Sequence, residues 1–192
     1  MSGSPVGLPD EAQGRALLKA ARRELLAVFG LDLTATDKPP VAEWQGPTGG
    51  LFATLELEGE LRGCIGYCRT DEPLLTLARR AVVGAAFDDP RFVRVSAEEV
   101  FRISISITVL APPVLVNDLS EVVIGRDGLL IERGRARGLL LPQVASRRGW
   151  CAEVFVAETC RKAGLAPDAW RDGATVVQRF EAVHFEEHID GR

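Results

Sequence analysis

Apolar residues recur along the chain with two different periods. Over residues 11–29 they follow a helical period, and Gly30 is suited to end a helix there. Over residues 51–58 apolar and polar side chains alternate, which is typical of a strand with one buried face. Residues 72–87 return to the helical pattern. The first half of the chain is therefore predicted to form a helix, a strand region and a second helix.

The strand predicted over residues 51–58 is expected to turn at Gly59 and to return over residues 61–67 as a hairpin. A three-residue loop centred on Gly59 places Glu56 opposite Arg62 and keeps the leucines on one face. A two-residue loop would place Arg62 on the leucine face. Because register follows burial, the three-residue loop is favoured. This register predicts the pairs Leu57–Leu61, Leu55–Gly63 and Thr54–Cys64, with Leu55, Leu57 and Leu61 buried.

The pattern of this hairpin occurs a second time in the chain. Four positions recur at one constant offset, and a predicted helix follows each hairpin, the second over residues 152–163. We therefore predict an internal duplication of one β/α unit, near residues 50–92 and 125–165. The four matched pairs are Leu55 and Leu130, Gly59 and Gly134, Arg62 and Arg137, and Gly63 and Gly138.

The remaining segments complete one domain. Alternating residues predict further strands over residues 101–110 and 175–185. A chain of 192 residues is the size of a single domain, which we expect to span residues 10–188. Residues 1–9 are small and mostly polar, and are expected to form a flexible leader.

Composition and charge narrow the class of protein. A net charge of −4 disfavours a protein whose main task is to neutralise a nucleic-acid backbone. The sequence has neither an apolar run long enough to cross a bilayer nor a secretory signal pattern, so a cytoplasmic location is expected. The four cysteines do not have the spacing of a disulfide framework or a zinc site, and free thiols are predicted.

Arg62 and Cys64 are the candidate catalytic residues. They lie two positions apart on a predicted strand, so both side chains project from the same face. A guanidinium beside a thiol favours the thiolate, which would make Cys64 reactive. The alternative is structural: Arg62 would pair with Glu56 across the hairpin, and Cys64 would be a small filler of the core.

Four other residues are candidates for ligand binding. Gly63 and Gly66 flank Cys64 and could let a ligand approach the backbone, or could serve close packing alone. Asp89 and Arg91 follow the second predicted helix and could be site residues near the first hairpin. The alternative is structural, because Pro90 disfavours helical backbone at the preceding residue and would simply end the helix.

A dyad of Cys64 with His184 is a further possibility, because partners in such dyads need not be close in sequence. His184 and His188 are the only histidines, and neither lies in a metal-binding motif. We therefore expect neither a metal site nor a cofactor. The glycine patterns of nucleotide-binding loops and the nucleophile elbow of serine hydrolases are absent from the sequence.

Four strings in this order resemble the AMMECR domain family, whose microbial members include AmmeMemoRadiSam system protein A. They read LRGCIG at residues 61–66, AAFDDPRF at 85–92, LLPQVA at 140–145 and TCRKAGL at 159–165. The resemblance extends over residues 15–186. It implies an α+β fold of two pseudo-symmetric repeats, whose strands form a barrel-like antiparallel sheet flanked by helices. It also implies association with Memo-like and radical SAM proteins.

Three functions are open at this point. The first is binding of a small molecule, or an enzyme reaction that uses Cys64, on a pocket formed by the hairpin. The second is a non-catalytic adaptor for other proteins, which would need an exposed apolar patch. The third is a nucleotide- or RNA-binding module, which the acidic balance disfavours. Neither the residues nor the resemblance identifies a ligand, a reaction class or an oligomeric state.

Overall fold

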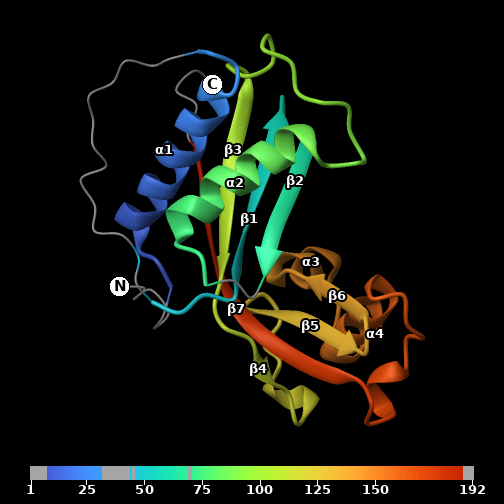
Figure 1. Ribbon diagram of the computed structural model, residues 1–192. Helices are drawn as coiled ribbons and strands as arrows, with labels where there is room; N and C mark the ends of the chain where they lie inside the picture. Colours follow the sequence, from blue (N-terminus) through green and yellow to red (C-terminus); the bar gives the residue numbers. More distant parts are fainter. Residues whose placement is uncertain (1–7, 32–43, 45, 69–70, 188–192) are drawn as a thin grey trace. The chain divides into compact units, whose positions relative to one another are not determined.

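The computed structural model describes residues 8–31, 44, 46–68 and 71–187, and its architecture is α+β, as predicted (Figure 1). Two compact units are present. The first consists of Met1–Val109 and Val183–Arg192, and the second of Leu110–Ala182. The flexible leader predicted at residues 1–9 lies outside the described residues, except for its last two positions.

The first unit is an antiparallel sheet with two helices packed on one face (Figure 1). Strand β2 ends the sheet, β1 and β3 follow, and the C-terminal end of β7 completes it. Fully buried Leu25, Leu55 and Ile105 show that helices and strands share one core. The elements are α1 (Glu11–Ala27), β1 (Gly50–Leu57), β2 (Glu60–Cys68), α2 (Leu74–Phe87), β3 (Ile103–Leu110) and β7 (Val176–Glu186).

Both helices form where the apolar pattern predicts them. Asp10 begins α1 as a capping box: its carboxylate accepts the amide of Gln13, and the Gln13 side chain accepts the amide of Asp10. Gly14 of α1 lies against the ring of Phe185 in β7, where an added Cβ would come within 2.1 Å of the ring. The apolar face of α1 is thereby seated directly on the sheet.

The predicted hairpin forms, but its loop is different. The loop has two residues, Glu58 and Gly59, both with positive φ, and Leu57 pairs with Glu60. A bulge after Leu55 then restores the predicted pairs Leu55–Gly63 and Thr54–Cys64. The predicted pairs Leu57–Leu61 and Glu56–Arg62 are therefore wrong.

Burial on the hairpin follows this register. Leu55 is fully buried, Leu57 is half-buried, and Leu61 is 42% exposed rather than buried. The bulge absorbs the residue that the shorter loop displaces, so Arg62 stays off the leucine face. The predicted pairing near Cys64 is correct, although the turn that leads to it is not.

In the second unit, strands β5 and β6 form a hairpin, β5 pairs with the first part of β7, and β4 adds to the other side of β7. Helix α4 matches the predicted helix at residues 152–163, whereas α3 has no counterpart in the sequence prediction. The elements are β4 (Val114–Leu115), η1 (Leu119–Glu121), β5 (Asp127–Arg133), β6 (Ala136–Leu140), α3 (Pro142–Arg148), α4 (Ala152–Lys162) and η2 (Ala169–Arg171).

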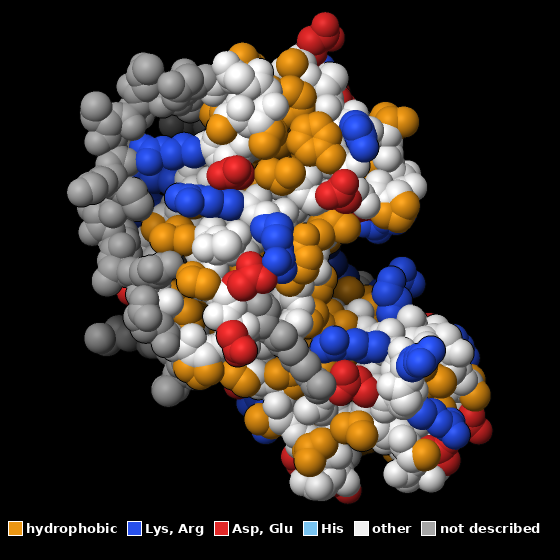
Figure 2. Space-filling model, in the orientation of Figure 1, with side chains coloured by type: hydrophobic (Ala, Val, Ile, Leu, Met, Phe, Trp, Pro, Cys, Tyr) orange, Lys and Arg blue, Asp and Glu red, His pale blue; other side chains and the backbone are white. Residues whose placement is uncertain are grey.

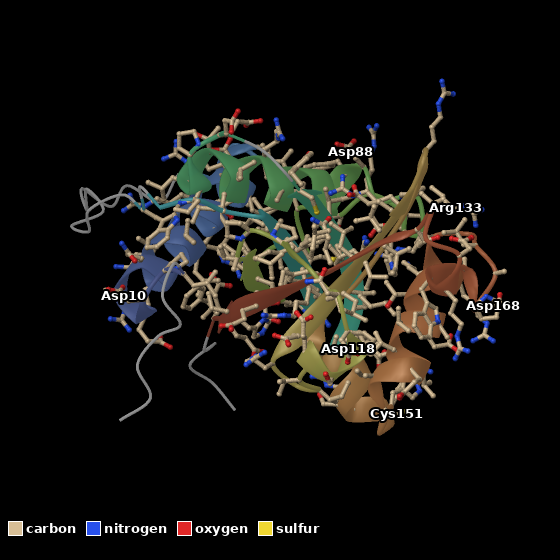
Figure 3. All side chains as sticks on the ribbon, turned by 90° about the horizontal axis from the view of Figure 1, so that it is seen from below. Asp10, Asp88, Asp118, Arg133, Cys151 and Asp168 are labelled. Carbon is tan, nitrogen blue, oxygen red and sulfur yellow. The ribbon has the colours of Figure 1, made fainter. Side chains whose placement is uncertain are left out.

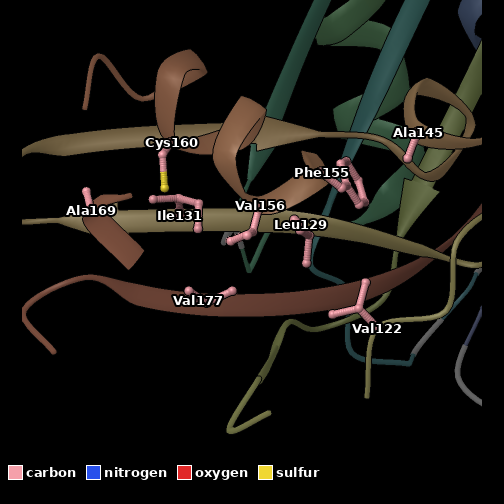
Figure 4. Close-up of a cluster of buried hydrophobic side chains, with 9 residues drawn as sticks. All are labelled: Val122, Leu129, Ile131, Ala145, Phe155, Val156, Cys160, Ala169 and Val177. Carbon is pink, nitrogen blue, oxygen red and sulfur yellow. The ribbon is translucent and has the colours of Figure 1, made fainter. Parts of the chain in front are cut away.

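A buried apolar cluster holds this second unit together (Figure 4). Phe155, Val156 and Cys160 of α4 pack against Leu129 and Ile131 of β5. Phe155 and Cys160 are completely buried, so the helix is fixed on the sheet along its length.

The two hairpins have one local feature in common. An added Cβ on Gly63 would lie 2.1 Å from the carbonyl oxygen of Ala85 in α2, and one on Gly138 would lie 2.6 Å from the carbonyl oxygen of Thr159 in α4. Each glycine thus admits a helix backbone close to its strand. The internal duplication itself stays a proposal.

No helix in the described part of the chain is long and apolar enough to cross a membrane. The four cysteines all lie in the described residues, and none forms a disulfide. Acidic and basic side chains are interspersed on the visible surface (Figure 2), without a continuous basic area there.

Candidate functional site

Asp89 is the centre of the site that the structure assembles in the first unit. Its Oδ2 atom accepts hydrogen bonds from the backbone N–H of Cys64 at 2.9 Å and from Arg91 Nη2 at 2.7 Å. Its Oδ1 atom accepts from Arg91 Nε at 2.9 Å and from the Arg91 amide at 3.1 Å. The side chain is only 3% exposed. One buried carboxylate therefore joins the strand that carries Cys64 to the guanidinium of Arg91.

The local sequence explains why Asp89 lies there. Helix α2 ends at Phe87, the residue before a pair of aspartates, and Asp88 marks this end of the helix in Figure 3. Pro90 disfavours helical backbone at Asp89, so the chain turns away at that point. The amide of Val95 then returns to the carbonyl of Ala86 at 2.9 Å. The turn brings Asp89 against the open edge of β2.

The pKa shifts of Asp89 and Arg91 favour the charged form of both side chains. The hydrogen bonds from Arg91 hold the pKa of Asp89 far below its ordinary value, against the effect of burial, and the amide of Cys64 adds to the lowering. The hydrogen bonds to Asp89 raise the pKa of Arg91, and negative charge on Cys64 adds to that effect. Arg91 stays 56% exposed, so its remaining N–H groups face solvent beside Cys64.

Cys64 lies half-buried on the sheet face opposite α2. Its Sγ atom accepts a hydrogen bond from Thr54 Oγ1 at 3.4 Å across the β1–β2 pair. A hydroxyl donor on β1 therefore contacts the thiol, and the cation of Arg91, which Asp89 orients, is near enough to interact with it electrostatically. Among the predicted site residues, the structure brings Cys64, Asp89 and Arg91 together.

Arg62 has a different position from the one predicted. Its Nε and Nη2 atoms donate to the two carboxylate oxygens of Glu99 at 2.8 and 3.1 Å, and Nη1 and Nη2 donate to the carbonyls of Val93 and Arg94 at 2.7 and 3.1 Å. The Arg62 hydrogen bonds lower the pKa of Glu99 to about 2. The side chain is 12% exposed and binds the segment after α2 that contains Val93, Arg94 and Glu99. The expected pairing of Arg62 with Glu56 is therefore wrong. The guanidinium binds Glu99 and two backbone carbonyls instead of the thiol of Cys64.

The two candidate glycines have clear packing contacts. Gly63 allows α2 to approach β2, as described above. Gly66 lies under the ring of Phe52, where an added Cβ would come within 2.1 Å of the ring. Phe52 and Gly66 are cross-strand partners, so the aromatic side chain covers the glycine on the same face as Cys64. A ligand-binding role for either glycine stays a prediction.

The possible Cys64–His184 dyad also stays a prediction. His184 is exposed, and its Nδ1 atom lies 3.1 Å from Thr108 Oγ1, whereas the thiol of Cys64 accepts from Thr54. Among the described residues, no cluster of three or more histidine, cysteine or acidic side chains could hold a metal ion.

Sequence reasoning missed a second buried carboxylate, Asp127 in the second unit. It is completely buried, and it accepts hydrogen bonds from both Arg126 Nε and Nη2 at 2.8 Å and from the Val123 amide at 2.9 Å. Burial alone would raise the pKa of Asp127, but these hydrogen bonds outweigh it and lower that pKa. Its neighbours Gly125 and Gly128 are typical of a turn, and nothing in that pattern indicates a buried carboxylate. Glu99, the partner of Arg62, gave no sequence signal.

Comparisons with known proteins place the chain among relatives of similar length. The profile of the AMMECR1 family matches residues 18–185. A protein of Methanothermobacter thermautotrophicus is 48% identical over 185 residues, which cover 91% of this chain and 94% of that protein. A protein of Pyrococcus furiosus is 41% identical, with coverage of 91% and 88%. The crystal structure of uncharacterized protein PH0010 from Pyrococcus horikoshii is similar with a TM-score of 0.79 at 38% identity, covering 95% of this chain and 94% of that one.

Proposed function

Since the chain belongs to the AMMECR1 family, we propose that it binds a small anionic ligand at Arg91, with the thiol of Cys64 beside the bound ligand. This is a ligand-binding or thiol-dependent enzymatic role, and it deepens the first of the functions considered from the sequence. The observation that carries it is the shared oxygen of Asp89. That atom holds both the Cys64 amide and the Arg91 guanidinium, so the cation is pre-oriented next to the thiol.

The arrangement suits an anion for two reasons. Asp89 uses the Nε and Nη2 donors of Arg91 and leaves the rest of the planar fork for a carboxylate or phosphate. The guanidinium is more than half exposed, whereas the carboxylate beneath it is buried. An incoming ligand therefore meets the positive partner of the pair first.

A non-catalytic adaptor is the second candidate function. The segment that Arg62 binds carries two apolar side chains in water: Val93 is 82% exposed and Phe101 is 65% exposed. Leu61, next to Arg62 on the edge strand, is 42% exposed. Exposed apolar side chains of this size are typical of contact surfaces for other proteins.

Competing alkylating agents test the leading proposal. The thiol of Cys64 is treated with neutral iodoacetamide and with anionic iodoacetate, and the modified peptides are quantified by mass spectrometry. A cation beside the thiol favours the anionic reagent. Arg91→Met is therefore expected to lower the iodoacetate-to-iodoacetamide rate ratio at Cys64 about fivefold, since one charge at this range is worth ~1 kcal/mol.

Three controls make the result specific. Arg91→Lys retains the charge and should keep most of the preference, which separates loss of charge from damage to the fold. Arg62→Met should leave the ratio at Cys64 unchanged, because its guanidinium is committed to Glu99. The exposed thiol of Cys151 should respond to neither change. If the ratio at Cys64 ignores Arg91, or if Cys64 reacts only after denaturation, the adaptor function moves ahead.

One further expectation rests on the family resemblance, and another rests on the lack of a signal or membrane-spanning pattern in the sequence. Association with Memo-like and radical SAM proteins is a proposal that copurification from the native host would test. The cytoplasmic location is a proposal that cell fractionation would test.

A further inference from the structure

The second unit contains a pocket that the proposed function does not use. Its volume is about 980 Å³, within the range of small-ligand and short-peptide sites. Its walls come from the segment before β5, the start of α4, η2 and the start of β7, all within this unit. Asp118 and Cys151, the residue that caps α4, lie at the same end of the unit in Figure 3.

The floor of the pocket is apolar and firmly held. Val122 and Val177 are more than nine-tenths buried and belong to the apolar cluster of Figure 4. Trp170 packs against the same cluster, and its backbone amide hydrogen-bonds the buried thiol of Cys160. A floor of this kind keeps its shape without a ligand, which limits the entropy lost on binding.

The rim of the pocket is acidic and charged at neutral pH. Asp118 and Glu153 are both exposed lining residues. Hydrogen bonds from Ser120 lower the pKa of Asp118, and the amide of Glu153 together with the side chain of Cys151 lowers the pKa of Glu153. Arg171 is the one basic lining residue, so the lining carries a net charge of −1 from two acids and one base.

Arg171 shows how this pocket accommodates a guanidinium. Its Cζ atom lies 4.7 Å from the centroid of the Trp170 ring, a cation–π contact. Its charge also contributes, as the smallest cause, to the lowered pKa of Glu153, so the guanidinium that stacks on Trp170 interacts favourably with this carboxylate. An exposed side chain of the protein itself thus occupies the place that suits a cation from outside.

We propose that this pocket binds an arginine side chain presented by an apolar segment of a partner protein. The charge of the rim matches a guanidinium, Trp170 offers a stacking face, and Val122 and Val177 offer apolar contacts for neighbouring side chains. The volume exceeds that of one arginine side chain, which favours a peptide segment over a free small cation. Arg171 is an internal competitor for this position.

The probe is a capped tripeptide, Leu-Arg-Leu, titrated into the ¹⁵N-labelled full chain and followed by NMR. The indole N–H of Trp170 and the amides of Val122 and Glu153 should shift. Leu-Gln-Leu, which has the same shape without the charge, should bind several-fold more weakly. Glu153→Gln should weaken the arginine peptide about threefold, the size expected of one exposed charge pair. Glu158→Gln, on the same helix outside the pocket, is the matched control and should have no effect.

The variant Arg171→Ala distinguishes a site for a cationic side chain from a site for an anion. Removal of the internal competitor should strengthen binding of Leu-Arg-Leu about threefold. Binding of a Leu-Glu-Leu peptide that is lost in Arg171→Ala would identify an anion site and overturn the proposal. Equal binding of the arginine and glutamine peptides, or an absence of shifts at Trp170, would also overturn it. If arginine amide alone binds as tightly as the peptide, the occupant is a small cation and the partner segment is wrong.

Discussion

Replacing Arg62 by methionine is expected to lower the free energy of unfolding by about 2–4 kcal/mol, the cost of breaking a partly buried charge pair. The side chain is 12% exposed, and Glu99, its partner, is 22% exposed. Methionine keeps the apolar stem of arginine but is shorter and loses all four hydrogen bonds to the segment after α2. The carbonyls of Val93 and Arg94 then lose these donors, and the Glu99 carboxylate keeps the hydrogen bond from the Ser96 amide but loses its charged partner.

The pKa of Glu99 is lowered mainly by the hydrogen bonds from Arg62, with a smaller contribution from Ser96. It falls from its ordinary 4.5 to about 2 in the folded protein. A pKa that is lowered on folding contributes stability above the unfolded value, and this stability is lost as pH falls through the folded value. The shift corresponds to about 3 kcal/mol, lost between about pH 4.5 and pH 2. This agrees with the range expected for Arg62→Met.

Urea denaturation of the wild type, Arg62→Met, Glu99→Gln and the double variant, from pH 7 to pH 2, tests this reasoning. The double variant should cost less than the sum of the single changes, because the two residues act as one pair. Glu99→Gln should reduce the loss of stability between pH 4.5 and pH 2. Arg102→Met is the matched control: its pair with Glu58 is more than half exposed on both sides and should cost less than about 1 kcal/mol.

The stabilising role of the Arg62 hydrogen bonds would be refuted if the free energy of unfolding of Arg62→Met lay within about 0.5 kcal/mol of the wild type, which is a typical surface effect. Additive single and double variants would refute the pairing with Glu99.

Three shorter predictions follow from other contacts. Asp89→Asn should destabilise the protein at neutral pH and flatten its loss of stability below about pH 4, because the lowered pKa of Asp89 contributes stability only above its unfolded value; acid titration by circular dichroism would show this. Gly63→Ala and Gly138→Ala should each cost about 1–3 kcal/mol in thermal unfolding, because each new methyl group meets a helix carbonyl; Gly134→Ala meets no neighbouring atom, but its positive φ should still cost about 1 kcal/mol through backbone strain. Asp127→Ala should be more destabilising than any of these, because it leaves Arg126 and the Val123 amide without their buried acceptor.

The sequence was sufficient for elements whose apolar period is long. The helices at residues 11–29 and 72–87 and the strands on either side of Gly59 follow from burial alone, and the structure contains them. Helix α3 was missed because its seven residues are too few to establish a period.

The hairpin loop was mispredicted because the pairing of the two strands is not continuous from the turn to Cys64. A two-residue turn and a bulge after Leu55 reach the same pairing at Cys64 by another route. Alternation of apolar residues cannot distinguish the two routes, since both put Leu55 on the buried face. Glu58 also adopts positive φ, which its residue type does not suggest.

The candidate site was only half predictable for a related reason. Asp89 and Arg91 are two residues apart, and a proline between them signals a turn. The partner of Arg62 is Glu99, 37 residues away in an irregular segment. No period or spacing connects those two residues, so only the folded chain could reveal that Arg62 pairs with Glu99 and that Arg91 is held by the carboxylate that also binds the Cys64 amide.

The hydrogen bond from the Cys64 amide to Asp89 also affects whether another strand can pair with the edge of the sheet. Strand β2 is the last strand on its side of the sheet, and an edge strand of this kind offers its N–H groups to any extended chain that meets it. Asp89 already occupies one of those donors, and a buried carboxylate there meets the carbonyls of an added strand unfavourably. The residue that orients the candidate site therefore also opposes pairing of a further strand with β2.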